Sequence, residues 1–597
     1  MVNIRLFLIL CCLSGLSLMV QGQQPYGSPL QMKESVTYLA SEDLGGRKSG
    51  TPGDSLAAVY IRKMFSEQGA RLMGNNGFQY FGVISDVRSG NHNQLTVNDH
   101  PYVQSVDFEP FSFSSNATVK ADVVFAGFGL SGNSGDLRWD DFEGKDIKGK
   151  WVVVLRGDPE PDNQNSAFIP MATDRAKALA VRDLGGAGLL LVSPSSIEKK
   201  DVPVEISYDK TIADAGIPVI SITRKVAAEI MNVEPQLIDS LEKQMIRVKK
   251  PLNHLTTASI EATTDIVREK VTTRNIIAMI PGNDPVLKNE YIVIGAHYDH
   301  LGMGGPGSGS RVPDEHAVHG GADDNASGVV ALISLISHFS QEKNRTPRSL
   351  VFVSFGAEEM GLLGSRYFTA NSPVELKSVK AMVNLDMVGR LSLENPVVTV
   401  SGTGTFSLAD TLVDRLAALR KFQVRKSPDG FGPSDHAAFY GEGIPVLFLT
   451  SGAHEDYHTP ADVASKLNYE GLNSITEFAG DLVAGLAALN PAPVFTESGS
   501  SRTGGHRYGR GLKVTLGIMP DVSGAETSGG MKVEGTRKDG PAFKAGMIKG
   551  DIITAINGLP VGNIYDYMSR MGKLKPGERV NVEVLRDGKK EILIIEL

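Results

Sequence analysis

The sequence is most constrained by a series of apolar runs between residues 256 and 489 that alternate with helix-like segments. Each run is continuous rather than alternating with polar residues, which is typical of strands covered on both faces of a sheet. Alternating strands and helices are the pattern of α/β folds, so we predict an α/β domain with a mostly parallel sheet and helices on both faces. The runs that predict strands are 275–280, 291–296, 350–355, 381–385, 397–400 and 445–449, and those that predict helices are 326–339 and 407–419.

Histidine and carboxylate residues follow these predicted strands. Open α/β sheets place their ligands beyond the carboxyl ends of the strands, so such residues are expected to meet at one edge of the sheet. Taken singly they have ordinary explanations, since His297 could be a core histidine and Asp324 could cap the next helix. Their joint occurrence instead favours a metal site, with the candidates His297, Asp324, Glu358, Glu359, Asp386 and His458.

The residue types in this set fit a pair of divalent metals. Two metals that share one carboxylate need about two further ligands each, and three carboxylates with two imidazoles meet that number. A sixth residue, Glu358, is then left to take a proton from a water whose pKa the metals lower. Asp299 stands two residues after His297 and could orient that imidazole.

The N-terminus predicts export. Arg5 precedes an apolar run over residues 6–20, and small residues near position 22 offer a cleavage point, so residues 1–22 are interpreted as a secretory signal peptide. The run is shorter than the roughly 20 residues of a membrane span, with a retained anchor and a lipoprotein as alternatives. Both cysteines, Cys11 and Cys12, lie in this segment. We therefore expect a periplasmic or secreted protein without disulfides and with no stable membrane span after signal removal.

The length of the chain indicates several domains, and its charge argues against nucleic-acid binding. The net charge is −8 and the charges are mixed along the chain, which leaves no clustered basic face for nucleic acid. At 597 residues the chain is too long for one domain. After the signal peptide we divide it into the first part of the α/β domain (23–120), an inserted domain (121–255), the rest of the α/β domain (256–490), a Pro-, Gly- and Ser-rich linker (491–510) and a C-terminal domain (511–597).

A glycine-rich loop in the first part of the α/β domain carries a further candidate residue. Arg47 lies in this loop, before a predicted helix at 55–68, which Asp54 could cap. Arg47 either braces the domain or contacts substrate or an interface. Two further histidines, His316 and His319, lie in the long loop between His297 and Asp324 and are expected at the surface or at the substrate rim.

Five motifs of the α/β domain resemble, in order, those of the M28 family of zinc peptidases, the aminopeptidases with a co-catalytic zinc pair. They are YIVIGAHYDHLG, GADDNASG, FGAEEMGLLGS, NLDMVG and YHTPAD, within about residues 256–490. The resemblance implies two zinc ions per catalytic domain. It assigns His297 and Asp386 to one zinc, Glu359 and His458 to the other, and Asp324 as the bridge between them.

The same resemblance implies catalytic and substrate contacts. It implies that Glu358 is the general base and that Tyr457 helps to stabilise the oxyanion. The stretch GFGPSDHAAFYGEGIP is similar to the family's substrate-side loop. The candidate substrate contacts are therefore Ser434, Asp435 and His436.

The other two domains resemble known companions of this fold. The insertion is rich in short β-branched strands, and its DFEGKDIKGKWVVVLRG and GGAGLLLVS resemble the protease-associated domain. That resemblance implies a lid or access role, with a spacer as the alternative. GPAFKAGMIKGDIITAINGLPV resembles a bacterial PDZ domain with an Asn-Gly hairpin turn, and LGIMPD stands where such domains hold a peptide carboxyl terminus. A degenerate PDZ domain used only for packing is the alternative.

These observations predict an exported dizinc metallo-exopeptidase that removes N-terminal residues from peptides. A carboxypeptidase or dipeptidase on the same fold is the enzymatic alternative, and it would need a basic clamp, for which Arg390 and Arg366 are available. A catalytically inactive peptide-binding scaffold is the alternative from another class of protein. Loss of Glu358 or of a ligand would indicate that scaffold, and none is missing.

Overall fold

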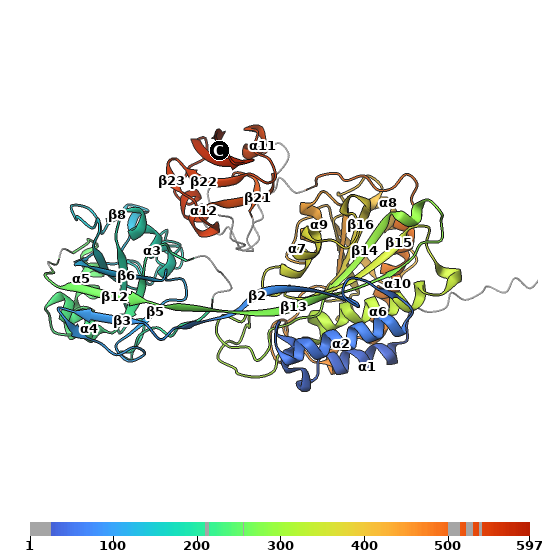
Figure 1. Ribbon diagram of the computed structural model, residues 1–597, viewed down its shortest axis with the longest axis horizontal. Helices are drawn as coiled ribbons and strands as arrows, with labels where there is room; N and C mark the ends of the chain where they lie inside the picture. Colours follow the sequence, from blue (N-terminus) through green and yellow to red (C-terminus); the bar gives the residue numbers. More distant parts are fainter. Residues whose placement is uncertain are drawn as a thin grey trace, which may run out of the picture.

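Three domains make up the described part of the chain (Figure 1). The computed structural model describes residues 26–208, 214–252, 254, 256–498, 514–520, 529–536 and 540–597. The predicted signal peptide lies outside these residues, as does the predicted linker beyond residue 498, so both stay predictions. Within the described ranges, no helix is long and apolar enough to span a membrane.

The α/β domain contains a nine-stranded sheet. Its strand order is β1-β13-β15-β14-β16-β19-β17-β18, with β2 paired to β13. The four central strands β15, β14, β16 and β19 are parallel, whereas β13 and β17 run antiparallel to their inner neighbours. The strands are β1 (Arg71–Leu72), β2 (Phe78–Ser89), β13 (Ile266–Ile280), β14 (Tyr291–His297), β15 (Ser349–Phe355), β16 (Val379–Leu385), β17 (Val397–Ser401), β18 (Gln423–Ser427) and β19 (Val446–Thr450).

Helices cover both faces of this sheet, which confirms the predicted fold class. Successive residues of a strand point to opposite faces, so Ile292 and Ile294 pack in one core cluster and Val293 in another. The first cluster includes side chains from α1 (Pro29–Leu39), α2 (Pro52–Glu67), α6 (Gly328–Phe339), α8 (Ala409–Ala417) and α10 (Tyr469–Ala488). The second includes α7 (Leu363–Ala370) and α9 (His436–Gly441).

The start of α2 differs from the sequence prediction. The helix begins at Pro52, and its cap is Thr51, whose hydroxyl accepts from the N–H of Asp54. The side chain of Asp54 is fully buried and accepts hydrogen bonds from the Gly50 N–H at 2.8 Å and from the Tyr298 hydroxyl. Asp54 therefore ties this loop to the end of β14 instead of capping the helix.

A two-stranded ribbon joins the α/β domain to the inserted domain (Figure 1). Strands β2 and β13 pair from Phe78↔Ile276 to Ser89↔Ile266, so the chain leaves and returns along the same ribbon. The insertion forms an eight-stranded sheet in the order β4-β3-β12-β6-β9-β10-β11-β5. Its elements are β3 (Gln94–Val97), β4 (His100–Pro101), β5 (Phe108–Pro110), β6 (Ala117–Phe125), β7 (Ser131–Ser134), β8 (Leu137–Asp140), β9 (Trp151–Leu155), α3 (Asp174–Asp183), β10 (Gly188–Val192), β11 (Val219–Ile222), α4 (Arg224–Met231), α5 (Gln236–Val248) and β12 (Ser259–Thr264).

The predicted bounds of the insertion, 121–255, are too narrow. Strands β3 to β5 precede residue 121 and β12 follows residue 255, yet all of them pair within the inserted sheet. β3 and β6 both pair with β12, whose residues lie about 140 to 170 positions further along the chain. Pairing over such a distance leaves no local sequence pattern, which is why the boundary was misplaced.

The C-terminal domain is mostly β, as predicted. A short helix precedes β22, and Asn557 and Gly558 turn the chain into β23 with positive φ values of 50° and 76°. This is the predicted Asn-Gly turn, in which both residues need that conformation. The elements are β20 (Ile518–Pro520), β21 (Met531–Thr536), α11 (Pro541–Lys544), β22 (Ile552–Ile556), β23 (Leu559–Pro560), α12 (Ile564–Met571), β24 (Arg579–Arg586) and β25 (Lys589–Glu596).

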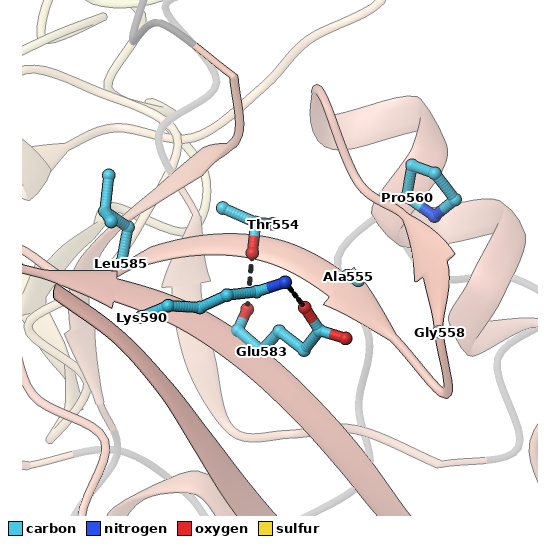
Figure 2. Close-up of a pocket in the computed structure, with 7 residues that line it drawn as sticks. All are labelled: Thr554, Ala555, Gly558, Pro560, Glu583, Leu585 and Lys590. Atoms are coloured by element: carbon cyan, nitrogen blue, oxygen red, sulfur yellow. Dashed lines mark hydrogen bonds and ion pairs between the residues drawn. The ribbon is translucent and has the colours of Figure 1, made fainter.

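A surface pocket of about 450 Å³ lies on the sheet of this domain (Figure 2). Figure 2 shows Lys590 paired with the Glu583 carboxylate across its floor, while the Thr554 hydroxyl donates to the Glu583 carbonyl at 3.3 Å. The remaining lining residues are Ala555, Gly558, Pro560 and Leu585. None of the predicted site residues lines this pocket.

The C-terminal domain is held against both other domains by ion pairs. Arg182 of α3 pairs with Asp566 at 2.6 Å, and Arg570 of α12 binds Asp183 with two nitrogens. On the other side, the Lys549 ammonium pairs with Glu442 of the α/β domain at 2.7 Å.

Candidate metal centre

The predicted metal ligands meet at the carboxyl edge of the four parallel strands. Because β14, β15, β16 and β19 run in one direction, their carboxyl ends share an edge, and the loops that follow them can meet there. β14 ends at His297, and Asp324 stands in the turn before α6. The other ligands come from the segments just after β15, β16 and β19 and are Glu359, Asp386 and His458.

One group of donors surrounds His297. Its Nε2 lies 3.2 Å from Oδ1 of Asp324 and 3.4 Å from Oδ1 of Asp386. Oε2 of Glu358 lies 4.0 Å from the same nitrogen. The His297, Asp324 and Asp386 donor atoms are close enough to one another to hold one metal ion.

A second group of donors surrounds the other oxygen of Asp324. Nε2 of His458 lies 3.1 Å from Asp324 Oδ2 and 3.2 Å from Glu359 Oε1. The two oxygens of Asp324 thus face different donor groups, as a bridging carboxylate would. A residue outside the predicted ligand set joins this group, because His300 Nδ1 lies 2.9 Å from Glu359 Oε1. The second histidine of the HYDH motif was the available sequence signal for it.

The turn that carries Asp324 is fixed by hydrogen bonds from its backbone. The Asp462 carboxylate accepts the N–H of Asp323 and, at 3.0 Å, that of Asp324. The Asn325 side chain donates to the Leu385 carbonyl and thereby joins this turn to the end of β16. Asp462 is the last residue of the YHTPAD motif, and its role could not be assigned without the fold.

Asp299 acts differently from the prediction. Its Oδ1 lies 3.9 Å from His297 Nδ1, which instead contacts the Asp299 backbone carbonyl at 3.2 Å. The carboxylate accepts the N–H groups of Glu358 at 2.9 Å and of Glu359 at 3.4 Å. Asp299 therefore positions the two glutamates through their backbone, and its main chain orients His297.

Arg47 braces the loops around the site. Arg47 is 1% exposed, so it cannot meet substrate, and its guanidinium donates to four backbone carbonyls. These include Tyr298 at 2.7 Å, just after His297, and Gly320 and Gly321 at 2.6 and 2.9 Å, just before Asp324. The bracing interpretation of Arg47 is confirmed, and the substrate interpretation is wrong.

The predicted substrate contacts are all buried, and two of them have other partners. The Ser434 hydroxyl donates to Asp386 Oδ2 at 2.7 Å and accepts from Asn384 at 2.8 Å, so Ser434 orients a ligand. His436 is fully buried and stacks on Phe448 with 4.5 Å between ring centroids, and burial lowers its pKa to about 3. Ser434 and His436 therefore do not line a substrate pocket here, because the loop folds them inward.

Asp435 is the third member of this loop. Its carboxyl group is fully buried, and burial raises its pKa to about 7, with His297 and Asp386 among the charges that influence it. Asp435 therefore belongs to the electrostatic surroundings of the His297 group, and substrate contact by Asp435 stays a prediction.

The glycine-rich loop after β14 orients His458. Nδ1 of His458 lies 3.0 Å from the Gly309 carbonyl of this loop, so Nε2 of the same ring faces Asp324 and Glu359. Tyr457 stacks on the same imidazole with 3.8 Å between ring centroids. In this loop His316 is exposed as predicted, whereas His319 is buried and contacts Ser310, which corrects its expected surface position.

Arg390, the candidate for holding a substrate carboxylate, forms an ion pair within the protein. It donates to Asp456 Oδ2 at 3.0 Å, and Lys466 pairs with Asp456 at 2.7 Å. Asp456 lies two residues before His458, so this pair steadies the His458 loop. Arg390 is therefore less suited to hold a substrate carboxylate.

The site holds more buried negative charge than its own cations balance. Asp299, Asp324 and Asp435 are at most 3% exposed, and the side chains of Glu358, Glu359 and Asp386 are at most 12% exposed. Burial raises the pKa of Asp299 to about 7 and, with the charges of Glu359 and Asp435, raises the pKa of Glu358 well above its ordinary value. Although burial opposes it, the charges of Glu359 and Asp324 raise the pKa of His458 to about 11.

This charge pattern fits metal cations. Buried carboxylates are costly unless they are paired or coordinate metals. Oxygen and imidazole donors in two groups that share Asp324 suit a pair of borderline divalent ions such as zinc. The described residues thus fit two metal positions, one at His297, Asp324 and Asp386 and the other at Asp324, Glu359 and His458.

Comparisons with known proteins agree with the motifs. Residues 275–483 match the family model of Peptidase family M28, and residues 514–597 match that of the PDZ domain. Leupeptin-inactivating enzyme 1 of Streptomyces exfoliatus is 26% identical over 326 residues, which cover 50% of this chain and 66% of that protein. An aminopeptidase of Pseudomonas aeruginosa is 24% identical over 478 residues, which cover 74% of this chain and 76% of that protein.

Among solved structures, BSAP, a zinc aminopeptidase from Bacillus subtilis, aligns with a TM-score of 0.47 at 20% identity over 77% of this chain and 94% of that one. The chain spans just under two thirds of the length of the Streptomyces relative. The predicted M28 and PDZ domains are confirmed by the family models. The resemblance of the insertion to the protease-associated domain stays a prediction.

Proposed function

We propose that this chain, whose residues 275–483 match Peptidase family M28, is a metallo-aminopeptidase that hydrolyses N-terminal residues from peptides with two zinc ions. The observation that carries the proposal is the pair of donor groups that share Asp324 beside Glu358. The Pseudomonas aeruginosa relative is named an aminopeptidase, which supports this reaction over a carboxypeptidase. The engagement of Arg390 by Asp456 supports the same choice.

The residues that would hold the zinc ions are the five predicted ligands. His297 and Asp386 would hold one ion, Glu359 and His458 the other, and Asp324 would bridge them. When bound, such a pair supplies Lewis acidity that polarises the scissile carbonyl and makes a water at the site more acidic.

Glu358 is the group in this chain best placed to move a proton. Its carboxylate lies beside the His297 donor group but outside the closest contacts, so it is free to accept a proton from the attacking water and to pass it to the leaving amine. The Asp299 carboxylate holds the Glu358 backbone at 2.9 Å and so fixes where this base stands. Tyr457 is stacked on His458, beside the donor group of the second metal position, where its hydroxyl could donate to a developing oxyanion.

The test combines metal analysis with two substrate series. The purified chain should contain about two zinc ions and cleave aminoacyl-p-nitroanilides and free peptides but not the same peptides with blocked N-termini. Glu358→Gln should keep its metal and lose about 10²–10⁴-fold in kcat, the usual contribution of a general base. Glu375→Gln, an exposed glutamate, is the matched control. Cleavage of blocked peptides, or full turnover by Glu358→Gln, would overturn the proposal.

Export is part of the proposal as well. It rests on the signal-like segment 1–22 alone. N-terminal sequencing of the protein recovered from the periplasm and medium should give a start near residue 23, and recovery of the intact chain from the cytoplasm would contradict it.

A further inference from the structure

The two donor groups around Asp324 differ in how many protein atoms they offer. Three donors surround the first position, from His297, Asp324 and Asp386. The second position has Asp324, Glu359 and His458, and it also has a fourth donor in reach, Nδ1 of His300. Zinc sites closed by four protein ligands are mostly structural, whereas catalytic sites keep a position open.

His300 is oriented toward the donor atoms of the second position. Its Nδ1 lies 2.9 Å from Glu359 Oε1 and 3.9 Å from Asp324 Oδ2, the same two oxygens that face His458 Nε2. His300, Asp324 and Glu359 by themselves form a group whose donor atoms could hold one metal ion. The His300 and His458 rings stand edge to face with centroids 5.7 Å apart, so both imidazoles enter this position from different sides.

The surroundings of His300 hold the ring in this orientation. Its side chain is fully buried, and a Cβ added at Gly321 would come within 2.6 Å of two ring carbons. The backbone N–H of His300 donates to the Arg47 carbonyl, in the loop that braces the whole site. A histidine that only filled the core would not need to aim a nitrogen at two carboxylates of the donor set.

We propose that His300 is a fourth protein ligand, through Nδ1, at the metal position that Asp324, Glu359 and His458 surround. This inference rests on the proposed function, because it requires that metals occupy the site. A fourth ligand from His300 would make the two metal positions differ in their number of protein ligands. The second position is closed by the protein, while the position at His297 and Asp386 keeps an open place that faces Glu358, where substrate and water would be accepted.

Cobalt(II) provides a test that does not depend on activity. The metal-free full chain is titrated with Co²⁺, and the visible absorption is compared for wild type, His300→Ala and the control His316→Ala, an exposed histidine of the next loop. Two Co²⁺ ions should bind to the wild type. In His300→Ala one of the two should bind at least about tenfold more weakly, since even partners of ligands alter affinity 10–100-fold. Its visible spectrum should also change, and His316→Ala should match wild type.

A second variant gives a positive signature. His300→Cys would place a sulfur near the present Nδ1, and a thiolate bound to cobalt adds a charge-transfer band in the near ultraviolet. Wild type contains only Cys11 and Cys12, in the predicted signal peptide, and serves as the baseline for this band. The band should appear in His300→Cys and disappear on chelation.

The outcomes separate this inference from the proposed function. If wild type binds no Co²⁺, the metal-dependent function fails and the inference fails with it. If wild type binds two ions while His300→Ala keeps both affinities within twofold and the spectrum of wild type, and His300→Cys shows no band, then only the inference is overturned. His300 would in that case merely donate a hydrogen bond to Glu359.

Discussion

Two clusters of buried charge in this protein are balanced in opposite ways. At the contact between the inserted and C-terminal domains, Arg182 and Arg570 meet Asp183 and Asp566, so two cations face two carboxylates. At the edge of the α/β sheet, six buried carboxylates gather around imidazoles, while the buried guanidinium of Arg47 donates its hydrogen bonds to backbone carbonyls. The first cluster is complete in the protein alone.

The comparison shows what a buried charge cluster is built to hold. In the cluster between the two domains, the ion pairs stabilise the buried charges and hold the domains in one orientation. The carboxylates around Asp324 are buried at a cost in free energy until cations bind them. The geometry of that site is therefore held by hydrogen bonds, in which Asp299 and Asp462 accept from the backbone of the ligand segments and Ser434 donates to a ligand. This difference can be tested by removing the metal or by changing single side chains in either cluster.

Removal of metal should affect the carboxylate cluster around Asp324 and leave the ion pairs between the two domains unchanged. Exhaustive dialysis against a chelator should abolish turnover, because no residue of the chain replaces the Lewis acid. It should also lower stability, by about 2.7 kcal/mol for each zinc ion removed, relative to protein with free zinc at a hundred times the Kd of that site. Kinetics and calorimetry before and after zinc is restored measure both effects. Turnover that survives in protein shown to be metal-free would contradict the comparison.

Loss of one cation should open the balanced cluster. Arg570→Ala removes the two closest hydrogen bonds of Asp183 and leaves it paired only with Arg182 at 3.0 Å, so we expect a loss below the roughly 3–5 kcal/mol of a fully unpaired buried charge. We expect the C-terminal domain to separate from the insertion, seen as faster proteolysis near residue 498 and a larger radius of gyration in solution scattering. Arg579→Ala is the control, since that side chain is 75% exposed. Identical scattering for both variants would show that the contact does not orient the domain.

Acid should reduce turnover through Glu358. A base must be deprotonated, and burial together with neighbouring carboxylates raises the pKa of Glu358 above its ordinary value of 4.5. Activity is therefore present above the pKa of Glu358 and is lost as the pH falls through it, and bound zinc ions, being cations, act against burial and lower that pKa. The profile of kcat/KM against pH measures this for zinc-loaded protein. A profile that stays flat over the whole acidic range in which the protein remains folded and metal-loaded would exclude Glu358 as the titrating base.

A small effect is expected from the loop that orients His458. Gly309 has a φ of 97°, which an L-residue adopts only with strain of about 1–2 kcal/mol, and its carbonyl contacts His458 Nδ1. Gly309→Ala should shift that carbonyl and weaken zinc binding by less than tenfold, as measured by competition with a chromogenic chelator. Gly577→Ala, with a φ of 78° in the C-terminal domain, applies similar strain away from the site and should leave zinc binding unchanged.

Most of the sheet and the helices α2, α6 and α8 were predictable from the sequence, whereas α7, α9 and α10 were not predicted. Continuous apolar runs located the central strands to within a residue or two, because a strand covered on both faces must be apolar throughout. Strand β18, with the sequence QVRKS, was missed, since it carries exposed charges at the edge of the sheet. The bounds of the insertion were missed because β12 pairs with strands far away in the sequence.

At the site, the sequence identified residue types but not all of their contacts. The ligand candidates stand at strand ends, so the order of the strands was enough to predict that they would meet. The contacts of Asp299, Ser434 and His300 depend on which way each side chain turns, and two of the three differ from the prediction while the third was not foreseen.

Local periodicity and residue chemistry were enough to predict the α/β pattern, the two domains whose family models match and the set of residues able to bind metal. The balance of charge, by contrast, became visible only in the folded protein. The tertiary structure paired Arg182 and Arg570 with the carboxylates of a neighbouring domain, and it directed the hydrogen bonds of Arg47 to backbone carbonyls. The reason is that a charge is balanced by what lies near it in space, and those neighbours come from segments up to several hundred residues apart.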